Sequence, residues 1–395
     1  MYPFISISQS RVDSVRYGHP WIFSGAIIEI DPTVVHGGLV RVVDEDGTCW
    51  GVGTYSGTSS IAVRVFDPQE VTIHVDWFIR RINEARDRRL ALGIGTGATT
   101  GYRVVFGEAD GIPGFILDCY SDICVFQLST AGLDQLRETI VEAVDRVFSP
   151  RVIVERSDVS VRKDDRLEQV IAVHKGENSG YVEFLENGRR YVADVMEGQK
   201  TGFFLDQREA RDTVQHLAAG KDCLNLFSYT GAFGVAAMVG GSTHCHNVDL
   251  SVRALEGCER HRALHGFNAD RFTTEEADIF QWLGEQHEPT YDLVVLDPPA
   301  IIKSSKDAEA GKKAYHFLNR AAMRLVRDGG VFVSSSCSQH LSEDDLFFML
   351  RRAAVQNHMD LRVLAVHRQA KDHPLSVYFE QASYLKTVVC EVRHR

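Results

Sequence analysis

The sequence predicts an α/β protein that ends in a doubly wound, largely parallel sheet, preceded by a small β-barrel and an α+β domain. Apolar runs and helical patterns alternate with short links from residue 191 to 357, as such a sheet requires. Two of these apolar runs end in residues that can take part in catalysis. One run ends in Asp297, which two prolines follow, and the other ends in Cys337. At 395 residues the chain is also longer than one ordinary domain, which predicts two or three.

Composition narrows the class of protein. No apolar stretch approaches the roughly 18 residues of a membrane span, and residues 1–10 lack a signal pattern, so we expect a cytoplasmic protein. Eight scattered cysteines are typical of reduced intracellular thiols, which leaves Cys337 free to react. A net charge of -11 excludes a simple nucleic-acid coat, so any RNA contact must use local patches.

Residues 1–70 are predicted to form the β-barrel. The runs 39–43 and 49–52 are joined by a turn with Asp46-Gly47, which is typical of a hairpin. This segment holds 4 Lys/Arg against 8 Asp/Glu, so its charge does not indicate RNA, and a plain β-domain attached to an enzyme is an equal alternative.

Residues 71–190 are predicted to form the α+β domain. Helical patterns at 77–92 and 133–148 flank strand-like runs at 115–118 and 123–128, and no catalytic group of residues is evident. The first helix carries five arginines, which either form a solvated face or contact phosphates. These arginines are Arg80, Arg81, Arg86, Arg88 and Arg89.

Residues 191–395 are predicted to form the doubly wound domain, and its first strand of interest, 223–227, leads into a glycine-containing loop. Glycine at 231 lets the backbone approach a ligand at the start of the next helix. The loop lacks the Gly-x-Gly-x-x-Gly spacing that seats a pyrophosphate, so S-adenosylmethionine fits better than a dinucleotide. The candidate cofactor-binding residues here are Phe227, Ser228, Tyr229 and Gly231.

Acidic residues follow the later strands of this domain. Asp249 ends the next strand, about twenty residues on, where a carboxylate can accept both ribose hydroxyls. Asp278 lies just beyond a short predicted strand, 271–274, and is placed for an adenine amino group. Successive predicted strands end near residues that could contact a cofactor, and together they indicate a cofactor site more strongly than any one of them does. These residues are Gly231, Asp249, Asp278 and Asp297.

Cys337 and Asp297 suit methyl transfer to carbon 5 of a pyrimidine, a carbon that is not nucleophilic by itself. A thiolate that adds to carbon 6 makes carbon 5 enamine-like, and removal of the carbon 5 proton later expels the thiolate. We expect Cys337 to be this nucleophile and Asp297 to stabilise the adduct at the ring nitrogen. A capping box from Ser342 to Asp345 is predicted to start the helix after Cys337. Core packing is the alternative role for an isolated strand-end cysteine.

The residues after the two prolines bear on the acceptor atom and on RNA contacts. Enzymes that methylate amino groups usually place an aromatic there, whereas this chain has Ala300, which favours carbon as the acceptor. Four lysines follow, and they either line an RNA backbone or form a solvated helix face. They are Lys303, Lys306, Lys312 and Lys313.

Histidine pairs in this domain do not predict a metal site. His244 and His246 have no second ligand pair at suitable spacing. His261 and His265 share a helix face without an adjacent glutamate or a third ligand, so we expect them at the surface. We therefore predict no metal.

Several segments together closely resemble the large-subunit ribosomal RNA cytosine-5 methyltransferases of the RlmI type, over essentially the whole chain. The segments are 18–25, 107–114, 198–208, 225–233, 297–306 and 335–340. The resemblance implies an amino-terminal PUA domain, a central domain seen in RNA methyltransferases, and a class I S-adenosylmethionine-dependent methyltransferase domain. It also implies Cys337 as nucleophile, Asp297 in the Asp-Pro-Pro motif, and Gln207 and Arg208 near the cofactor.

The expected activity is therefore methylation of carbon 5 of a cytosine in 23S ribosomal RNA, and three alternatives stay open. A uridine-5 methyltransferase would use the same thiolate chemistry. A purine amino methyltransferase would not need Cys337. A non-catalytic RNA-binding assembly factor would bind cofactor without turnover. The expected partner is large-subunit ribosomal RNA, with no membrane and no metal, and a homodimer is allowed for.

Overall fold

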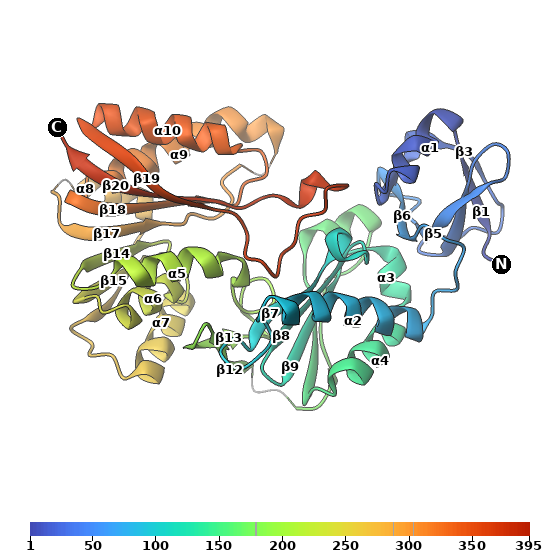
Figure 1. The fold of residues 1–395 in the computed structure, drawn as a ribbon, viewed down its shortest axis with the longest axis horizontal. Helices are drawn as coiled ribbons and strands as arrows, with labels where there is room; N and C mark the ends of the chain where they lie inside the picture. The colour runs from blue at the N-terminus through green and yellow to red at the C-terminus, as the bar shows by residue number, and fades with distance from the viewer. Residues whose placement is uncertain (178–179, 287, 303) are drawn as a thin grey trace. The chain divides into compact units, whose positions relative to one another are not determined.

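The computed structural model describes residues 1–177, 180–286, 288–302 and 304–395. The chain forms two compact units (Figure 1). Unit 1 comprises residues 1–187, 193–205 and 371–382, and unit 2 comprises residues 188–192, 206–370 and 383–395. The segment 371–382 therefore belongs to unit 1 although it lies between two strands of unit 2 in the sequence.

The amino-terminal part of unit 1 is a six-stranded sheet of order β2-β6-β5-β4-β1-β3. Its elements are β1 (Phe4–Ile7), α1 (Gln9–Arg16), β2 (Trp21–Phe23), η1 (Ser24–Ala26), β3 (Ile27–Ile30), β4 (Leu39–Val43), β5 (Cys49–Tyr55) and β6 (Ile61–Asp67). β1 pairs antiparallel with β3 and parallel with β4, so the sheet is mixed and has β2 and β3 as its edges. It is an open half-barrel rather than a closed barrel.

The predicted hairpin in this sheet is confirmed, with β4 and β5 antiparallel. Asp44 Oδ1 accepts hydrogen bonds from the backbone amides of Asp46 (3.0 Å) and Thr48 (2.8 Å). Gly47 has a φ of 84°, which only glycine adopts without strain. The turn residues therefore set the register of this pair.

The central part of unit 1 is a five-stranded sheet of order β11-β10-β9-β8-β7. Its elements are α2 (Val75–Ala91), β7 (Gly101–Phe106), η2 (Gly107–Asp110), β8 (Phe115–Tyr120), β9 (Ile123–Leu128), α3 (Ala131–Gln135), α4 (Arg137–Phe148), β10 (Val152–Ser157), η3 (Ser160–Asp165) and β11 (Val170–Lys175). α2 and α4 pack on each other and share one apolar core with β7, β8 and β9. A two-stranded sheet of β12 (Tyr181–Glu186) and β13 (Arg189–Asp194) follows.

The five arginines of α2 all contact carboxylates. Arg89 is buried and forms a bidentate pair with Asp110, at 2.6 and 2.7 Å, and Arg88 contacts the same carboxylate at 2.8 Å. Arg80 and Arg81 lie beside Asp67 and Glu84, and Arg86 beside Asp87. This helix face is therefore charge-compensated within unit 1, which weakens the interpretation that it contacts phosphates.

Unit 2 contains a seven-stranded sheet of order β16-β15-β14-β17-β18-β20-β19. Its strands are β14 (Asp222–Leu226), β15 (His244–Asp249), β16 (Phe272–Glu276), β17 (Tyr291–Leu296), β18 (Val326–Ser336), β19 (Met359–His367) and β20 (Lys386–His394). The first five strands in this order are parallel, and β20 runs antiparallel to both of its neighbours. This doubly wound sheet confirms the predicted fold class.

Helices cover both faces of this sheet, which is why its central strands are buried over most of their length. The helices are α5 (Arg208–Leu217), α6 (Ala232–Val239), α7 (Val252–His265), α8 (Ile279–Glu285), α9 (Ala308–Met323) and α10 (Glu343–Gln356), with short 3₁₀ turns η4 (Leu205–Gln207) and η5 (Ser305–Asp307). A further 3₁₀ turn, η6 (Glu380–Ala382), lies in the segment that belongs to unit 1. α8, α9 and α10 share a core with the sheet, while α6 and α7 contact β14, β15 and β16 (Figure 1).

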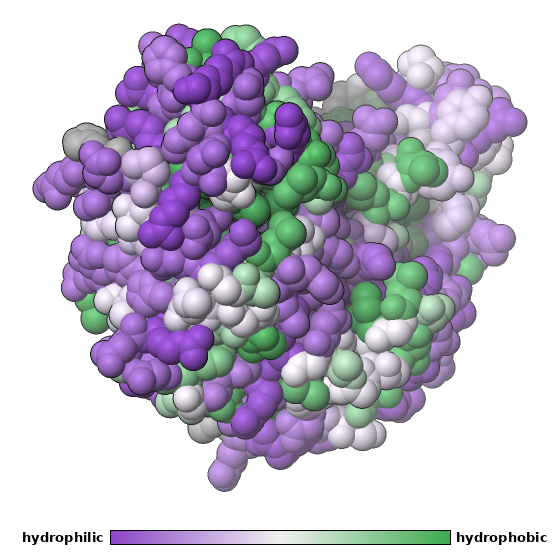
Figure 2. All heavy atoms as spheres, turned by 60° about the vertical axis from the view of Figure 1, so that its left-hand side comes forward, coloured by the Kyte–Doolittle hydropathy of each residue, from purple (hydrophilic) through white to green (hydrophobic). Residues whose placement is uncertain are grey.

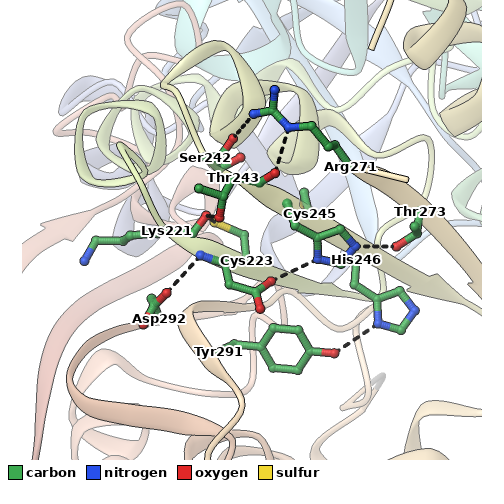
Figure 3. Close-up of polar contacts among 12 residues, drawn as sticks. Lys221, Cys223, Ser242, Thr243, Cys245, His246, Arg271, Thr273, Tyr291 and Asp292 are labelled. Atoms are coloured by element: carbon green, nitrogen blue, oxygen red, sulfur yellow. Dashed lines mark hydrogen bonds and ion pairs between the residues drawn. The ribbon is translucent and has the colours of Figure 1, made fainter. Parts of the chain in front are cut away.

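Polar side chains lock the amino-terminal edge of this sheet (Figure 3). His244 contacts Asp222 through Nδ1 (2.9 Å) and Thr273 Oγ1 through Nε2 (3.0 Å). His246 contacts the Tyr291 hydroxyl through Nδ1 (3.1 Å) and Glu275 through Nε2 (3.0 Å). All four ring nitrogens thus serve the fold, and the described residues hold no group of three or more His, Cys, Asp and Glu arranged for a metal ion.

The surface shows no large apolar belt on the face drawn in Figure 2, where hydrophilic residues predominate and hydrophobic ones form smaller groups. Among the described residues, no helix has the length and apolar character that crossing a membrane would need.

Candidate active site

The two strands that carry the predicted catalytic residues are neighbours. β17 and β18 are parallel, with Leu296 opposite Ser334, so their carboxyl ends lie at the same edge of the sheet. Asp297 follows β17 directly, and Cys337 follows the last residue of β18. Both side chains are partly exposed, unlike the buried strands before them. The expectation that this carboxylate and this thiol face one crevice is therefore supported by the strand order.

Asp297 is oriented by a residue from a distant part of the chain. Gln207, at the start of α5, donates a hydrogen bond of 2.9 Å from Nε2 to Asp297 Oδ1. Gln207 is buried, and its Oε1 accepts a hydrogen bond of 3.3 Å from Thr387 on β20. The family resemblance implied only a position near the cofactor for Gln207. The structure adds that it fixes the carboxylate of the Asp-Pro-Pro motif.

A tyrosine from α9 ties the loop that carries Cys337 to the loop that follows the two prolines. The hydroxyl of Tyr315 lies 3.0 Å from the Oγ atoms of both Ser336 and Ser338, the residues on either side of Cys337. Ser338 Oγ also accepts a hydrogen bond of 3.2 Å from the amide of Ile302, in the loop that follows the two prolines. Burial raises the pKa of Tyr315, so its hydroxyl stays protonated and able to donate.

The helix after Cys337 begins as predicted. Ser342 and Asp345 form the expected capping box, in which each side chain bonds to the other residue's backbone amide. Asp345 also pairs with Lys312 at 2.7 Å. Of the four lysines for which an RNA contact and a solvated helix face were the two alternatives, Lys312 is thus partly neutralised, and Lys303 lies outside the described residues. Lys312 and Lys313 line a pocket of about 440 Å³ between α9 and α10.

The glycine-containing loop between β14 and α6 has a strained backbone. Phe227 and Tyr229 have φ values of 57° and 48°, and Gly231 has 76°. Left-handed conformations are unfavourable for the first two residues and persist only where the surrounding structure enforces them, often at ligand sites. The amide of Ser228 bonds to Val248 O (3.0 Å), which ties this loop to the end of β15.

Asp249 lies at the end of β15 and holds the same loop. Its Oδ2 accepts a hydrogen bond of 2.8 Å from the amide of Tyr229, and its Oδ1 accepts one of 2.9 Å from Ser251. The predicted ribose-binding carboxylate is therefore beside the predicted cofactor loop. A strained loop opening a helix, with a carboxylate at the next strand end, is a donor set that fits a nucleoside cofactor.

Asp278 and Arg208 each lie at the start of a helix. Asp278 is the N-cap of α8, because its Oδ1 accepts hydrogen bonds from the amides of Phe280 (2.9 Å) and Gln281 (3.2 Å). Arg208 is buried at the first position of α5. Contacts of these two residues with a cofactor stay predictions.

The expectation that His261 lies at the surface is wrong, because its side chain is completely buried. Nδ1 lies 2.7 Å from Thr230 O in the predicted cofactor loop, and the amide of Val192 donates to Nε2 at 2.8 Å. These partners require a neutral ring with the proton on Nδ1. Burial lowers the pKa of His261 to about 4. The buried Leu255 and Cys258, at three-residue spacing before it, are the signal that could have predicted this.

Two family models match the chain. A model for S-adenosylmethionine-dependent methyltransferases matches residues 136–369, and a model for PUA-like domains matches residues 5–68. The first covers more than half of the chain and includes the strand ends that carry Asp249, Asp297 and Cys337.

Curated proteins and solved structures resemble the chain over nearly its full length. Proteins named Ribosomal RNA large subunit methyltransferase I are 37% identical over 399 residues in Aeromonas salmonicida, covering 100% of both chains, and 35% identical over 391 residues in Alteromonas mediterranea, covering 98% of both. The crystal structure of SMU.776 complexed with SAH has a TM-score of 0.83 at 24% identity, covering 98% of this chain and 99% of the other. That structural likeness supports the fold.

Proposed function

Because this chain belongs to the ribosomal RNA large subunit methyltransferase I family, and to the S-adenosylmethionine-dependent methyltransferases, we propose that it methylates carbon 5 of a cytosine in 23S ribosomal RNA. The observation that carries the choice of atom is the pairing of β17 with β18, which brings Asp297 and Cys337 to one edge of the sheet. A thiol beside a carboxylate is what addition to a pyrimidine ring requires.

The protein's part in the reaction is to bind, orient and activate. When bound, S-adenosylmethionine supplies an electrophilic methyl group. The loop 227–231 and Asp249 would hold it, with Asp278, Gln207 and Arg208 as further candidates. The thiolate of Cys337 adds to carbon 6 of the cytosine and forms a carbon–sulfur bond, which makes carbon 5 nucleophilic. Asp297, oriented by Gln207, would hydrogen-bond the ring nitrogen and stabilise the adduct.

The test is nucleoside mass spectrometry of unmodified large-subunit ribosomal RNA incubated with purified protein and S-adenosylmethionine. We expect 5-methylcytidine with the wild type and with Cys49→Ala, a partly exposed cysteine far along the chain from the site, and none with Cys337→Ala. Calorimetric titration with S-adenosylmethionine should show that Cys337→Ala still binds the cofactor.

Other results would select among the alternatives. 5-Methyluridine would assign the pocket to the uracil ring, since the same thiolate addition serves both rings. A methylated purine amino group formed equally by Cys337→Ala would overturn the covalent mechanism. Cofactor binding without methylation of either naked RNA or large-subunit particles would favour the RNA-binding assembly factor.

The cellular location and the oligomeric state of the protein are two further parts of the proposal. Ribosomal RNA as the substrate supports a cytoplasmic location, because ribosomes form there. The homodimer stays a prediction, and light scattering after size-exclusion chromatography distinguishes 44.2 kDa from twice that mass.

A further inference from the structure

A buried lysine lies beside the loop that carries Cys337. Lys386 is the first residue of β20, and it pairs directly with Ser336, the residue before Cys337. The side chain is only 7% exposed, which is unusual for lysine because burial of an ammonium is unfavourable unless its charge is used. Lys386 is not among the residues to which the proposed reaction assigns a role.

The ammonium group holds the chain on the other side of Cys337. Lys386 Nζ donates hydrogen bonds of 2.7 Å to Ser338 O and 2.6 Å to Leu341 O. The turn between Cys337 and the start of α10 is thereby closed around the ammonium. Because both acceptors are neutral carbonyls, these bonds satisfy the donors without cancelling the positive charge.

The acidic groups near Lys386 are already shared with other cations. Burial lowers the pKa of Lys386, and the negative charges of Cys337, Glu343 and Asp345 oppose that effect. Asp345 is paired with Lys312 at 2.7 Å, and Glu343 lies 3.4 Å from Arg368. Cys337 is the third member of this set, and it lies on the loop that Lys386 itself holds.

Two other groups near the Cys337 loop, Tyr315 and Asp297, carry no positive charge. Tyr315, from α9, is neutral because burial raises its pKa. Asp297, at the end of the neighbouring strand, is an acidic residue. A positive charge beside this loop favours the ionised form of its thiol, and the ammonium group of Lys386 is placed to provide one.

We propose that Lys386 is a positioning residue that holds the Cys337 loop and favours the thiolate form of Cys337. The proposal rests on the proposed function, in which Cys337 is the nucleophile. The thiol proton passes to solvent, the S–H electron pair stays on Sγ and then forms the bond to carbon 6, and the ammonium keeps its own proton. Electrostatic coupling is mutual, so the attraction that retains the proton on Lys386 also stabilises the thiolate.

The test is the rate of Cys337 alkylation by iodoacetamide as a function of pH, followed by mass spectrometry of the peptide that contains it. In Lys386→Met we expect the pH midpoint to rise by about one unit or more, so that the rate near pH 7 falls roughly tenfold. Lys386→Arg keeps the charge and should restore most of the reactivity. Lys221→Met, which removes a lysine before β14 at the opposite edge of the sheet, is the matched control and should react like the wild type.

A midpoint in Lys386→Met equal to that of the wild type would overturn the proposal. If Lys386→Met does not fold, the nitrogen-15 titration of Lys386 in wild type and in Cys337→Ser decides instead. We expect its midpoint to fall in Cys337→Ser, and an unchanged midpoint would overturn the proposal.

These measurements separate the proposal from the proposed function. Alkylation needs neither RNA nor cofactor, so a shifted midpoint in a protein that fails to methylate RNA would keep the role of Lys386 in ionising Cys337 and reject the reaction. Methylation of RNA by the wild type, together with an unchanged alkylation midpoint in Lys386→Met, would support the proposed reaction and reject this role of Lys386. If both hold, the methylation rate of Lys386→Met should recover as pH rises above the new midpoint, which loss of structure alone would not produce.

Discussion

Gln207 and Asp297 are joined by a hydrogen bond of 2.9 Å, from Nε2 to Oδ1, although 90 residues separate them in the sequence. The bond connects the start of α5 to the end of β17, and Thr387 on β20 holds the other end of the Gln207 amide. Three separate segments thus fix one carboxylate. The Asp-Pro-Pro motif supplies the acid, and the tertiary structure supplies its orientation.

Gln207→Ala should slow methyl transfer. A hydrogen bond to a charged group contributes about 1.5–3 kcal/mol, so we expect the single-turnover rate constant at saturating RNA and cofactor to fall roughly 10- to 100-fold. Gln356→Ala, at the exposed end of α10, is the matched control and should keep the wild-type rate. A wild-type rate in Gln207→Ala would show that the orientation of Asp297 does not matter for the chemistry.

Asp249→Asn should weaken the binding of S-adenosylmethionine. The substitution keeps the shape of the side chain but removes the charge that accepts hydrogen bonds from Tyr229 and that we assign to the ribose hydroxyls. We expect the Kd measured by isothermal titration calorimetry to rise at least about tenfold. Asp270→Asn, an exposed residue before β16, should leave the Kd unchanged. Equal affinities in both variants would reject the ribose assignment.

Arg89→Met should destabilise unit 1. It leaves the carboxylate of Asp110, whose side chain is 0% exposed, without its bidentate partner, and removing one partner of a buried ion pair costs about 3–5 kcal/mol. Urea denaturation should show this loss, whereas Arg86→Met breaks an exposed contact with Asp87 and should change stability by about 1 kcal/mol or less. Equal free energies of unfolding for the two variants would show that the buried pair contributes no more to stability than the exposed contact does.

The same pair predicts how stability depends on acid. Burial raises the pKa of Asp110, but the hydrogen bonds and charges of Arg89 and Arg88 outweigh it and lower the pKa below the ordinary value. The unfolded chain therefore binds this proton at higher pH than the folded chain does. The stabilisation should be present above about pH 4 and decline as pH falls further, and Arg89→Met should lack this part of the decline in acid titrations followed by circular dichroism.

His261 predicts a second pH dependence, at higher pH. Its pKa is about 4 in the folded protein against an ordinary value of 6.5, because burial disfavours the charged ring. Between these values the unfolded state binds a proton that the folded state does not, so stability should rise with pH in this window, by about 3 kcal/mol in total. His261→Gln should flatten this rise in urea denaturation measured at several pH values. His340→Gln, at an exposed position, should keep the wild-type slope.

The sequence alone determined the features that depend on neighbours along the chain. The Asp46-Gly47 hairpin turn and the Ser342–Asp345 capping box follow from local backbone preferences, and both are confirmed. The alternation of buried strands and helices likewise predicted a sheet whose carboxyl edge holds Asp297 and Cys337. Such patterns can be recognised in a sequence because side chains on one face recur every second residue in a strand and every 3.6 residues in a helix.

Only the tertiary structure decided which distant side chains meet. Gln207 reaches Asp297, Tyr315 reaches Ser336 and Ser338, and Lys386 closes the Cys337 loop. His261 is buried for the same reason, because β13 and the predicted cofactor loop pack over the face of α7 that carries it. These contacts depend on strand order and on the register between β18 and β20, and a hydrophobic pattern is compatible with many such arrangements.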